Sequence, residues 1–141
     1  MRAMSGAVFA RPHRIHFSEC DPAGIVFYPQ YFVLFNDLLE GWVDSLLPEG
    51  FAGLIGTRRV GLPTVRLEVD FKAVSRMGDD VTLRLQVQRV GGASVTLRLS
   101  CEGADGSLRM QALQTVVCTS LHTHKAIEVP ADLRAAIGAV G

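Results

Sequence analysis

The stretch that decides the fold is FSECDPAGIVFYPQYFVLFNDLLEGWVDSLL, residues 17–47, which joins an acidic turn directly to a long apolar segment. Pro29 predicts the first turn of a helix, because proline lacks an N–H group that would be unpaired at that position anyway. Apolar residues then recur at helical spacing, and Pro48 ends the pattern. We expect a helix over residues 29–46, about 27 Å long. A helix this apolar must be wrapped by other elements rather than laid on a surface.

The tetrapeptide Asp21-Pro22-Ala23-Gly24 precedes this helix and favours a tight turn. It places the Asp21 carboxylate a few residues ahead of the helix N-terminus. The free N–H groups and the positive dipole end there favour an ionised carboxylate, and they can also receive a polarised carbonyl oxygen. The residues alone leave two interpretations open: Asp21 closes an Asx turn, which is the commoner use of such a tetrapeptide, or it is a catalytic carboxylate.

After residue 63 the pattern changes from helical to alternating, which predicts β-strands. In residues 64–72 the apolar side chains alternate with charged ones, so we expect a half-buried strand. Its outward face, which meets solvent or another subunit, carries Arg66, Glu68, Asp70 and Lys72. The other expected elements are a loose lead-in over residues 1–10, a first strand at 14–17, a loop at 49–61 with a short helical turn, strands at 81–87 and 95–99 joined by a Gly91-Gly92 turn with positive φ, an Asp105-Gly106 hairpin turn, a last strand at 108–119 with a bulge near Ala112-Leu113, and a terminal helix at 130–137.

One buried helix followed by several amphipathic strands predicts an α+β fold, in which a curved antiparallel sheet wraps around the helix. At 141 residues and 48% hydrophobic, the chain is long enough to bury a core of its own. We therefore expect a single domain over residues 1–141.

The segment from Asp21 to Tyr31, DPAGIVFYPQY, preceded by Phe17 and Cys20, resembles the signature of the 4-hydroxybenzoyl-CoA thioesterase family of hotdog-fold enzymes. The likeness extends over nearly the whole chain, through Leu62-Pro63, Phe71, the Gly78-Asp79-Asp80-Val81 turn and the closing residues 126–132. The resemblance implies a hotdog fold with one long central helix. It also implies an enzyme that hydrolyses an acyl-CoA thioester to free acid and CoA.

Hydrolysis of a thioester needs a group that attacks, or activates attack at, the carbonyl carbon, and donors for the oxyanion that develops. Asp21 is the candidate for the first role, either as a nucleophile forming a mixed anhydride or as a general base for water. The resemblance implies the backbone N–H of Tyr28 for the second role. The ring of Tyr28 is equally well explained by ordinary core packing.

The resemblance also suggests where the acyl group binds. Asn36 stands where 4-hydroxybenzoyl-specific members carry an aspartate, and an amide can bond a phenol but supplies no charge. An aromatic, 4-hydroxybenzoyl-like acyl group is the first expectation, and a short-chain or general acyl-CoA is the alternative. A non-catalytic acyl-CoA-binding module is the alternative from another class, whereas a dehydratase is disfavoured because no histidine lies between His16 and His122. The expected substrate-binding residues are Phe27, Tyr31, Phe35, Asn36 and Pro63.

A basic triplet that contacts CoA phosphates in the resembling members is replaced here by Gly91-Gly92-Ala93. We expect Arg89, Lys125 and Arg59 to take over that contact, although each is also explained as an ordinary solvated charge. Coenzyme A enters as part of the substrate, and no other cofactor is expected. Hotdog domains resemble one another in pairing edge to edge, so a homodimer is expected, and beyond it a homotetramer built as a dimer of dimers.

Composition excludes several other classes of function. Fourteen basic and fourteen acidic residues cancel, so no basic excess is available to neutralise nucleic-acid phosphates. No apolar run approaches the roughly 20 residues of a membrane span, and the N-terminal run is too short for a signal peptide. We therefore expect a soluble, cytoplasmic protein without nucleic-acid or membrane partners.

Cysteine and histidine spacing indicates neither disulfides nor a metal site. Cys20, Cys101 and Cys118 are odd in number and lack a C-x-x-C spacing. A Cys20–His16 catalytic pair is disfavoured because the two lie far apart along a strand. The H-x-H sequence of His122 and His124 is expected to form a surface loop.

Overall fold

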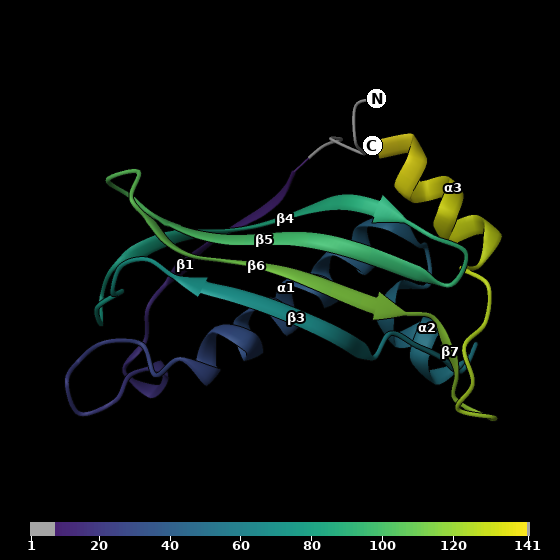
Figure 1. Ribbon diagram of the computed structural model, residues 1–141, viewed down its shortest axis with the longest axis horizontal. Coiled ribbons are helices and arrows are strands. Elements are labelled where there is room, and N and C mark those ends of the chain that lie inside the picture. The colour runs from purple at the N-terminus through teal and green to yellow at the C-terminus, as the bar shows by residue number, and fades with distance from the viewer. Residues whose placement is uncertain (1–7, 141) are drawn as a thin grey trace.

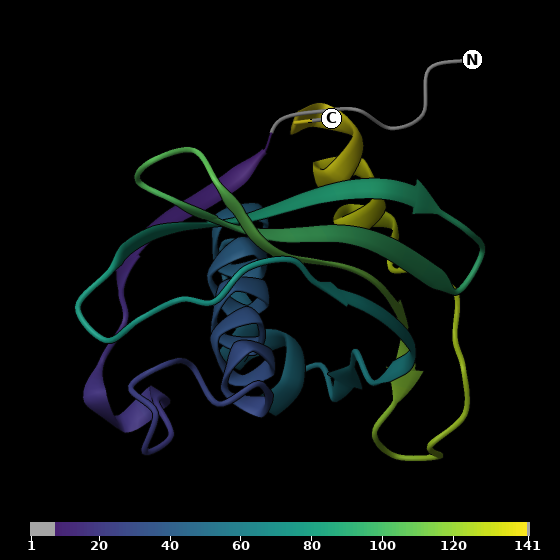
Figure 2. The ribbon, with the colours of Figure 1, turned by 60° about the vertical axis from the view of Figure 1, so that its left-hand side comes forward.

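The computed structural model describes residues 8–140, in which a five-stranded antiparallel sheet wraps around the long helix α1 (Pro29–Leu46) (Figure 1). In Figure 2, where α1 stands upright, the strands cross over the helix as a single curved layer. Neighbouring strands all pair antiparallel. The strand order is β1 (Phe9–Arg14), β4 (Asp80–Val90), β5 (Ser94–Gly103), β6 (Leu108–Val117) and β3 (Thr64–Phe71).

Smaller elements close the two ends of this layer. A 3-10 helix (Phe17–Glu19) follows β1, and α2 (Gly50–Gly56) packs on α1. The short strands β2 (Val60–Gly61) and β7 (Thr119–Ser120) form a separate two-stranded sheet. The chain ends in α3 (Ala131–Val140), which also contacts α1. No helix in the described part of the chain is both long and apolar enough to span a membrane.

The core lies between one side of α1 and the concave face of the sheet. Burying a valine, leucine, phenylalanine or methionine side chain completely contributes about 1.5–3 kcal/mol to the free energy of folding, compared with leaving it exposed. The helix supplies Tyr31, Leu34, Phe35, Leu38, Leu39, Trp42 and Val43, and the central strands supply Val81, Leu83, Leu85, Val95, Leu97, Leu99, Cys101, Met110, Ala112 and Val116. The wrapped-helix fold expected from the pattern is therefore confirmed.

The first strand was predicted too late in the chain. It runs from Phe9 to Arg14, so the predicted lead-in is wrong for its last residues, while residues 1–7 lie outside the described part. Residues 17–19 form a 3-10 turn, which is stabilised by a hydrogen bond from the backbone N–H of His16 to the Glu19 carboxylate. In the predicted loop at 49–61, the expected short helical turn is present as α2, which is longer than one turn, and the strand β2 was not expected.

The hairpin predictions were right in place but not in every detail. Gly106 has a φ of +83°, as an Asp-Gly turn requires. Gly91 and Gly92 do join β4 to β5, yet neither has a positive φ. Tertiary hydrogen bonds fix their conformation instead: the carbonyl of Gly91 accepts from the Arg134 guanidinium, and that of Gly92 accepts from Arg134 and the Val129 N–H.

The bulge predicted near Ala112-Leu113 is absent, because β6 pairs continuously with both neighbours there. The β5–β6 register shifts instead at Cys101/Glu102, which leaves Arg109 as the extra residue of β6. The predicted last strand also divides, with β6 ending at Val117 and β7 following.

Strand β3 is the exposed edge of the sheet. It pairs with β6 along one side only, and all of its residues except Val69 are exposed. The predicted half-buried strand is therefore wrong for this chain by itself. Val65 is 61% exposed, Leu67 40% and Phe71 51%, so an apolar surface runs along this edge. Native proteins rarely leave such an edge uncovered.

Candidate active site

The Asp21 turn has the geometry that its sequence predicts. The Gly24 N–H donates to the Asp21 carbonyl at 2.9 Å, and Gly24 has a φ of +78°, a conformation that favours glycine. The Asp21 carboxylate accepts the Ala23 N–H at 2.8 Å, which is an Asx turn. This contact occupies one carboxylate oxygen and leaves the other without a hydrogen bond to the described residues. Asp21 therefore forms the predicted Asx turn, and its other carboxylate oxygen remains available for a catalytic role.

A short antiparallel ladder carries the chain from this turn to α1. The Asp21 N–H donates to the Ile25 carbonyl, Cys20 bridges Val26, and the Phe27 N–H donates to the Glu19 carbonyl at 2.9 Å. The turn and the helix N-terminus are therefore fixed relative to each other by backbone hydrogen bonds.

The N-terminus of α1 offers one open backbone donor. Pro29 has no N–H, and the N–H groups of Gln30 and Tyr31 donate to the carbonyls of Phe27 and Tyr28. The N–H of Tyr28 donates to no acceptor among the described residues. A free N–H at the positive end of an 18-residue helix is suited to a developing oxyanion.

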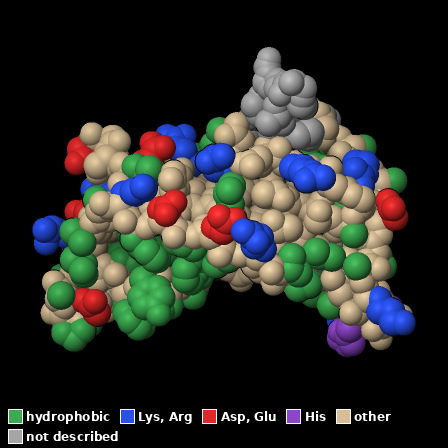
Figure 3. Space-filling model, viewed as in Figure 1, with side chains coloured by type: hydrophobic (Ala, Val, Ile, Leu, Met, Phe, Trp, Pro, Cys, Tyr) green, Lys and Arg blue, Asp and Glu red, His purple; other side chains and the backbone are tan. Residues whose placement is uncertain are grey.

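A hollow of about 290 Å³ is lined by Tyr28 and lies between the start of α1 and the chain that follows β3. Its wall includes Ile25, which lies directly across the turn from Asp21, as well as Tyr28, Tyr31 and Phe71. A second hollow of about 430 Å³ follows farther along α1, again bordered by β3. Figure 3 shows apolar side chains gathered below β3, where the first half of α1 lies. Both hollows therefore lie against α1, and each is bordered by β3 or the segment after it.

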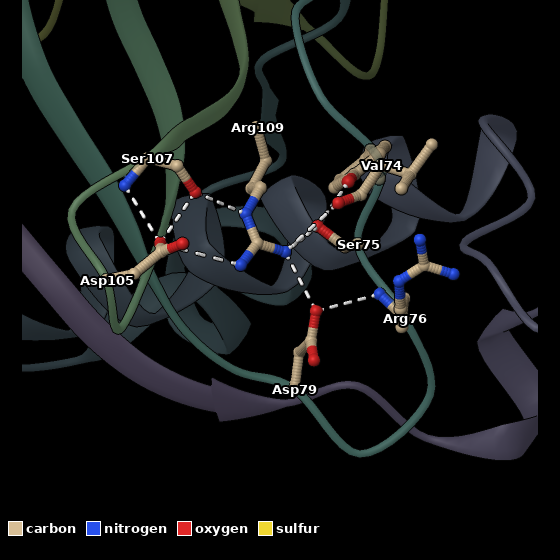
Figure 4. Close-up of polar contacts among 8 residues, drawn as sticks. Val74, Ser75, Arg76, Asp79, Asp105, Ser107 and Arg109 are labelled. Atoms are coloured by element: carbon tan, nitrogen blue, oxygen red, sulfur yellow. Dashed lines mark hydrogen bonds and ion pairs between the residues drawn. The ribbon is translucent and has the colours of Figure 1, made fainter.

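The sequence analysis did not predict that Arg109 and the segment after β3 hold the Asp21 turn in place. In the segment after β3, the Ser75 carbonyl accepts a hydrogen bond from the Val26 N–H, and the Met77 N–H donates to the Gly24 carbonyl. Arg109 in turn fixes that segment, because its guanidinium donates to the Val74 carbonyl, the Ser75 hydroxyl and the Asp79 carboxylate (Figure 4).

Arg109 reaches this position because it is the bulged residue of β6. Its side chain is only 11% exposed, and it lies 2.8 Å from the Asp79 carboxylate. A bulge redirects one side chain of a strand, but no local sequence pattern marked Arg109 as that residue. The break in the alternation of residues 108–119 did predict a bulge in this strand. The prediction put the bulge at Ala112-Leu113, three residues after its observed position at Arg109.

Removing the Asp79 charge is expected to destabilise the protein at neutral pH but not in acid. The Arg76 backbone N–H and the Arg109 guanidinium hold the pKa of the Asp79 carboxyl below its ordinary value. Its stabilising effect is therefore complete above about pH 4 and is lost as pH falls through the lower folded-state pKa. We expect Asp79→Asn to cost about 2 kcal/mol at pH 7, the scale of a hydrogen bond to a charged group. Urea unfolding at pH 7 and pH 3 measures this difference, and an equal cost at both values contradicts the ion pair.

The predicted substrate residues separate into two groups. Tyr31 lines the first hollow, and its hydroxyl donates to Ser75 at 2.8 Å. Phe35 and Asn36 line the second hollow. Phe27 and Pro63 line neither: Phe27 is 48% exposed with its ring against that of Tyr28, and Pro63 is exposed.

The predicted CoA-binding cations are all exposed and lie toward one end of the sheet. Arg89 is near the end of β4, and Lys125 follows β7. Arg59 precedes β2 with a φ of +54°, and its carbonyl accepts the Leu121 N–H beside β7. The neighbouring Arg58 is engaged, because it pairs with Glu49 and Asp132.

The cysteines have the environment of unreactive thiols. Burial raises the pKa of Cys101 to about 11 and also raises that of Cys118. Burial, together with the neighbouring Glu19 and Asp21 carboxylates, raises the pKa of Cys20. Its thiol contacts the backbone carbonyl of His16 rather than the imidazole, so the disfavoured Cys–His pair does not form.

Comparison with known proteins places the chain in a family. The family model described as the thioesterase-like superfamily matches residues 15–137. The chain belongs to the thioesterase-like superfamily. The resemblance drawn from the Asp21 segment is thereby confirmed.

Curated relatives of this superfamily member are CoA thioester hydrolases by name. This chain is 32% identical over 115 residues to the 1,4-dihydroxy-2-naphthoyl-CoA hydrolase of Synechococcus sp. (strain CC9311), and the match covers 72% of this chain and 74% of the relative. It is 28% identical over 134 residues to the 4-hydroxybenzoyl-CoA thioesterase of Pseudomonas sp. (strain CBS-3), covering 84% and 89%.

Solved structures of the superfamily share its fold. A mutant 4-hydroxybenzoyl-CoA thioesterase, crystallised with 4-hydroxybenzoyl-CoA, is 25% identical, with a TM-score of 0.84 over 92% of this chain and 98% of that one. The 1,4-dihydroxy-2-naphthoyl-CoA thioesterase from Synechocystis has a TM-score of 0.83 at 22% identity, over 93% and 96%. These likenesses confirm the predicted hotdog fold.

Proposed function

We propose that this protein hydrolyses acyl-CoA thioesters that carry a hydroxylated aromatic acyl group. Its family and its named relatives support the coarser statement, an acyl-CoA thioesterase. The observation that carries the proposal is the Tyr28 N–H at the start of α1, which has no acceptor among the described residues. Tyr28 lines an apolar hollow, and the Asp21 turn precedes it in the chain.

In the proposed reaction the Tyr28 N–H binds the thioester oxygen. In one route Asp21 attacks the carbonyl carbon, the CoA thiolate leaves, and water then hydrolyses the mixed anhydride to the free acid. In the other, Asp21 accepts a proton from the attacking water, and the CoA thiolate leaves directly.

The larger hollow supports an aromatic acyl group with uncharged polar substituents. About 430 Å³ is room for an aromatic ring, and most of its lining is apolar, including Phe35 and Leu67. The polar side chains in the lining are Asn36, Thr64 and Gln114, and Gln114 already donates to Thr64 at 2.7 Å. Amide and hydroxyl groups without charge suit phenolic hydroxyls better than carboxylates. Two of the similar proteins are named for hydroxylated aromatic acyl groups, which agrees with this choice.

Thiol release from a matched panel of acyl-CoA thioesters tests the function. We expect kcat/KM for 4-hydroxybenzoyl-CoA and 1,4-dihydroxy-2-naphthoyl-CoA to exceed that for straight-chain acyl-CoA by at least ~10-fold, the scale of one well-made hydrogen bond. Similar values across the panel favour the general thioesterase. Binding without thiol release favours the non-catalytic module.

We further propose that the active unit is a dimer formed through the edge strand β3. Its apolar exposed residues and unpaired backbone edge supply the surface, and both hollows open against the same strand. The basic residues Arg59, Lys125 and Arg89 remain our proposal for the CoA phosphates, because they are exposed and Arg59 and Lys125 flank the same small sheet.

A charge on β3 is expected to weaken this dimer. In a two-fold interface the substitution is present on both partners, and each lysine replaces an apolar contact with a charge that must lose its hydration. We expect Val65→Lys to raise the dimer dissociation constant at least ~10-fold in sedimentation experiments, whereas Val65→Thr, which keeps the branched shape, retains the dimer. A monomeric wild-type protein, or an unaffected lysine variant, contradicts pairing through β3.

A further inference from the structure

A cluster of metal-binding side chains lies outside the proposed catalytic site. His13 stands near the end of β1, and His16 and Glu19 border the 3-10 turn that follows. The His13 Nε2 atom lies 2.9 and 3.0 Å from the two carboxylate oxygens of Glu19, and the His16 Nδ1 atom lies 3.6 Å from one of them. One ligand atom from each of the three residues lies within 4.8 Å of the ligand atoms of the other two.

A plain histidine–glutamate hydrogen bond explains only part of this geometry. It accounts for His13 and Glu19, whose side chains are 19% and 12% exposed. It does not account for the second imidazole, which lies against the same carboxylate with its ring edge-to-face on that of His13 at 5.2 Å. Two imidazole nitrogens and one carboxylate form the donor set that zinc and similar divalent metals accept.

The surroundings leave room for the remaining coordination positions. The cluster lines a hollow of about 240 Å³ that Asp37 of α1 also borders. Arg11 borders it as well, but its guanidinium lies over the Phe9 ring at 4.2 Å and donates to the Ala10 carbonyl. The hollow therefore gives water access to the open side of a bound ion.

The Glu19 carboxylate is prepared for this role. Its side chain is 12% exposed, and both of its carboxylate oxygens lie within hydrogen-bonding distance of the His13 ring. The His16 N–H donates to the carboxylate at 2.9 Å and so orients it, as outer hydrogen bonds do in metal sites.

We propose that His13, His16 and Glu19 bind a divalent first-row metal ion, of which Zn²⁺ is the best match, with water in the open position. In a tetrahedral site the ligand atoms are about 3.3 Å apart, so coordination requires the His13–Glu19 distances of 2.9 and 3.0 Å to widen slightly and the His16–Glu19 distance of 3.6 Å to shorten. The three ligand atoms, which now lie within 4.8 Å of one another, must close in on the ion. The Glu19 carbonyl accepts the Phe27 N–H, so a bound ion also tightens the ladder that carries the Asp21 turn. The site has a structural role and takes no part in the proposed hydrolysis.

Calorimetric titration of the metal-free full-length protein with ZnCl₂ tests the proposal. We expect saturable binding of one ion per chain, with a rise in Tm, because the ion binds the folded state. His16→Ala is the decisive variant, since the side chain is 62% exposed and its loss leaves the His13–Glu19 contact intact. It is expected to weaken binding at least ~10-fold, as losing one of three ligands requires.

A double variant of the other two histidines is the matched control. His122 and His124 lie in an exposed loop and form the only competing H-x-H sequence. Removing both by alanine is expected to leave the zinc affinity unchanged. The proposal is overturned if no saturable binding occurs below about 1 mM zinc, well above the affinities of protein zinc sites. It is equally overturned if binding survives in His16→Ala and disappears in the double variant.

Discussion

Replacing Asp21 by asparagine is expected to lower kcat on an acyl-CoA substrate at least ~100-fold while leaving acyl-CoA binding largely intact. The asparagine side-chain oxygen can still accept the Ala23 N–H, as the aspartate does at 2.8 Å, so the turn is preserved. The amide cannot act as nucleophile or general base at neutral pH. The variant therefore separates the structural use of residue 21 from the chemical one.

The control for this experiment is Glu40→Gln, which removes one exposed carboxylate from α1, outside the hollows and without a partner among the described residues. Unchanged turnover is expected in that variant. Release of free thiol reports kcat, and competition with a non-hydrolysable acyl-CoA thioether reports binding. Retained turnover in Asp21→Asn removes this carboxylate from the mechanism.

Replacing Tyr28 by proline is expected to lower kcat by roughly 10²–10³, the usual effect of losing one oxyanion donor. Proline deletes the N–H itself, which side-chain substitutions cannot do. The fold is expected to tolerate the change, because that N–H bonds to nothing in the described residues and the φ of −52° at Tyr28 suits a proline ring.

The matched variant Tyr28→Ala keeps the N–H and deletes the ring. We expect it to retain a kcat within about tenfold of the wild type, because the ring is 57% exposed and the oxyanion bond is undisturbed. Circular dichroism and Tm establish that both variants are folded. Equal rates in the proline and alanine variants contradict the assignment of this N–H.

The features that were predictable are those encoded by local sequence. Pro29 and the apolar spacing after it placed α1 at its observed bounds. Asp21, Pro22 and Gly24 predicted the turn, since each residue suits its own position in a β-turn. Both features position the candidate site, so its location could be proposed from the sequence alone.

The features that were not predictable depend on contacts between distant segments. The alternation in residues 64–72 predicted a strand, and β3 forms there, but the exposure of both of its faces depends on its place at the edge of the sheet. The Gly91-Gly92 turn owes its conformation to Arg134 and Val129, far away in sequence. The position of Arg109 behind the Asp21 turn likewise required the β5–β6 register.

The central claim is that the thioester carbonyl lies against the Tyr28 N–H with the side chain of residue 21 facing its carbonyl carbon. A crystal structure of the Asp21→Asn variant with intact 4-hydroxybenzoyl-CoA tests it most directly. We expect the thioester oxygen about 2.7–3.1 Å from the Tyr28 nitrogen, with the acyl ring in the hollow beside α1. A thioester bound elsewhere, or a carbonyl oxygen out of hydrogen-bonding reach of Tyr28, contradicts the proposed site.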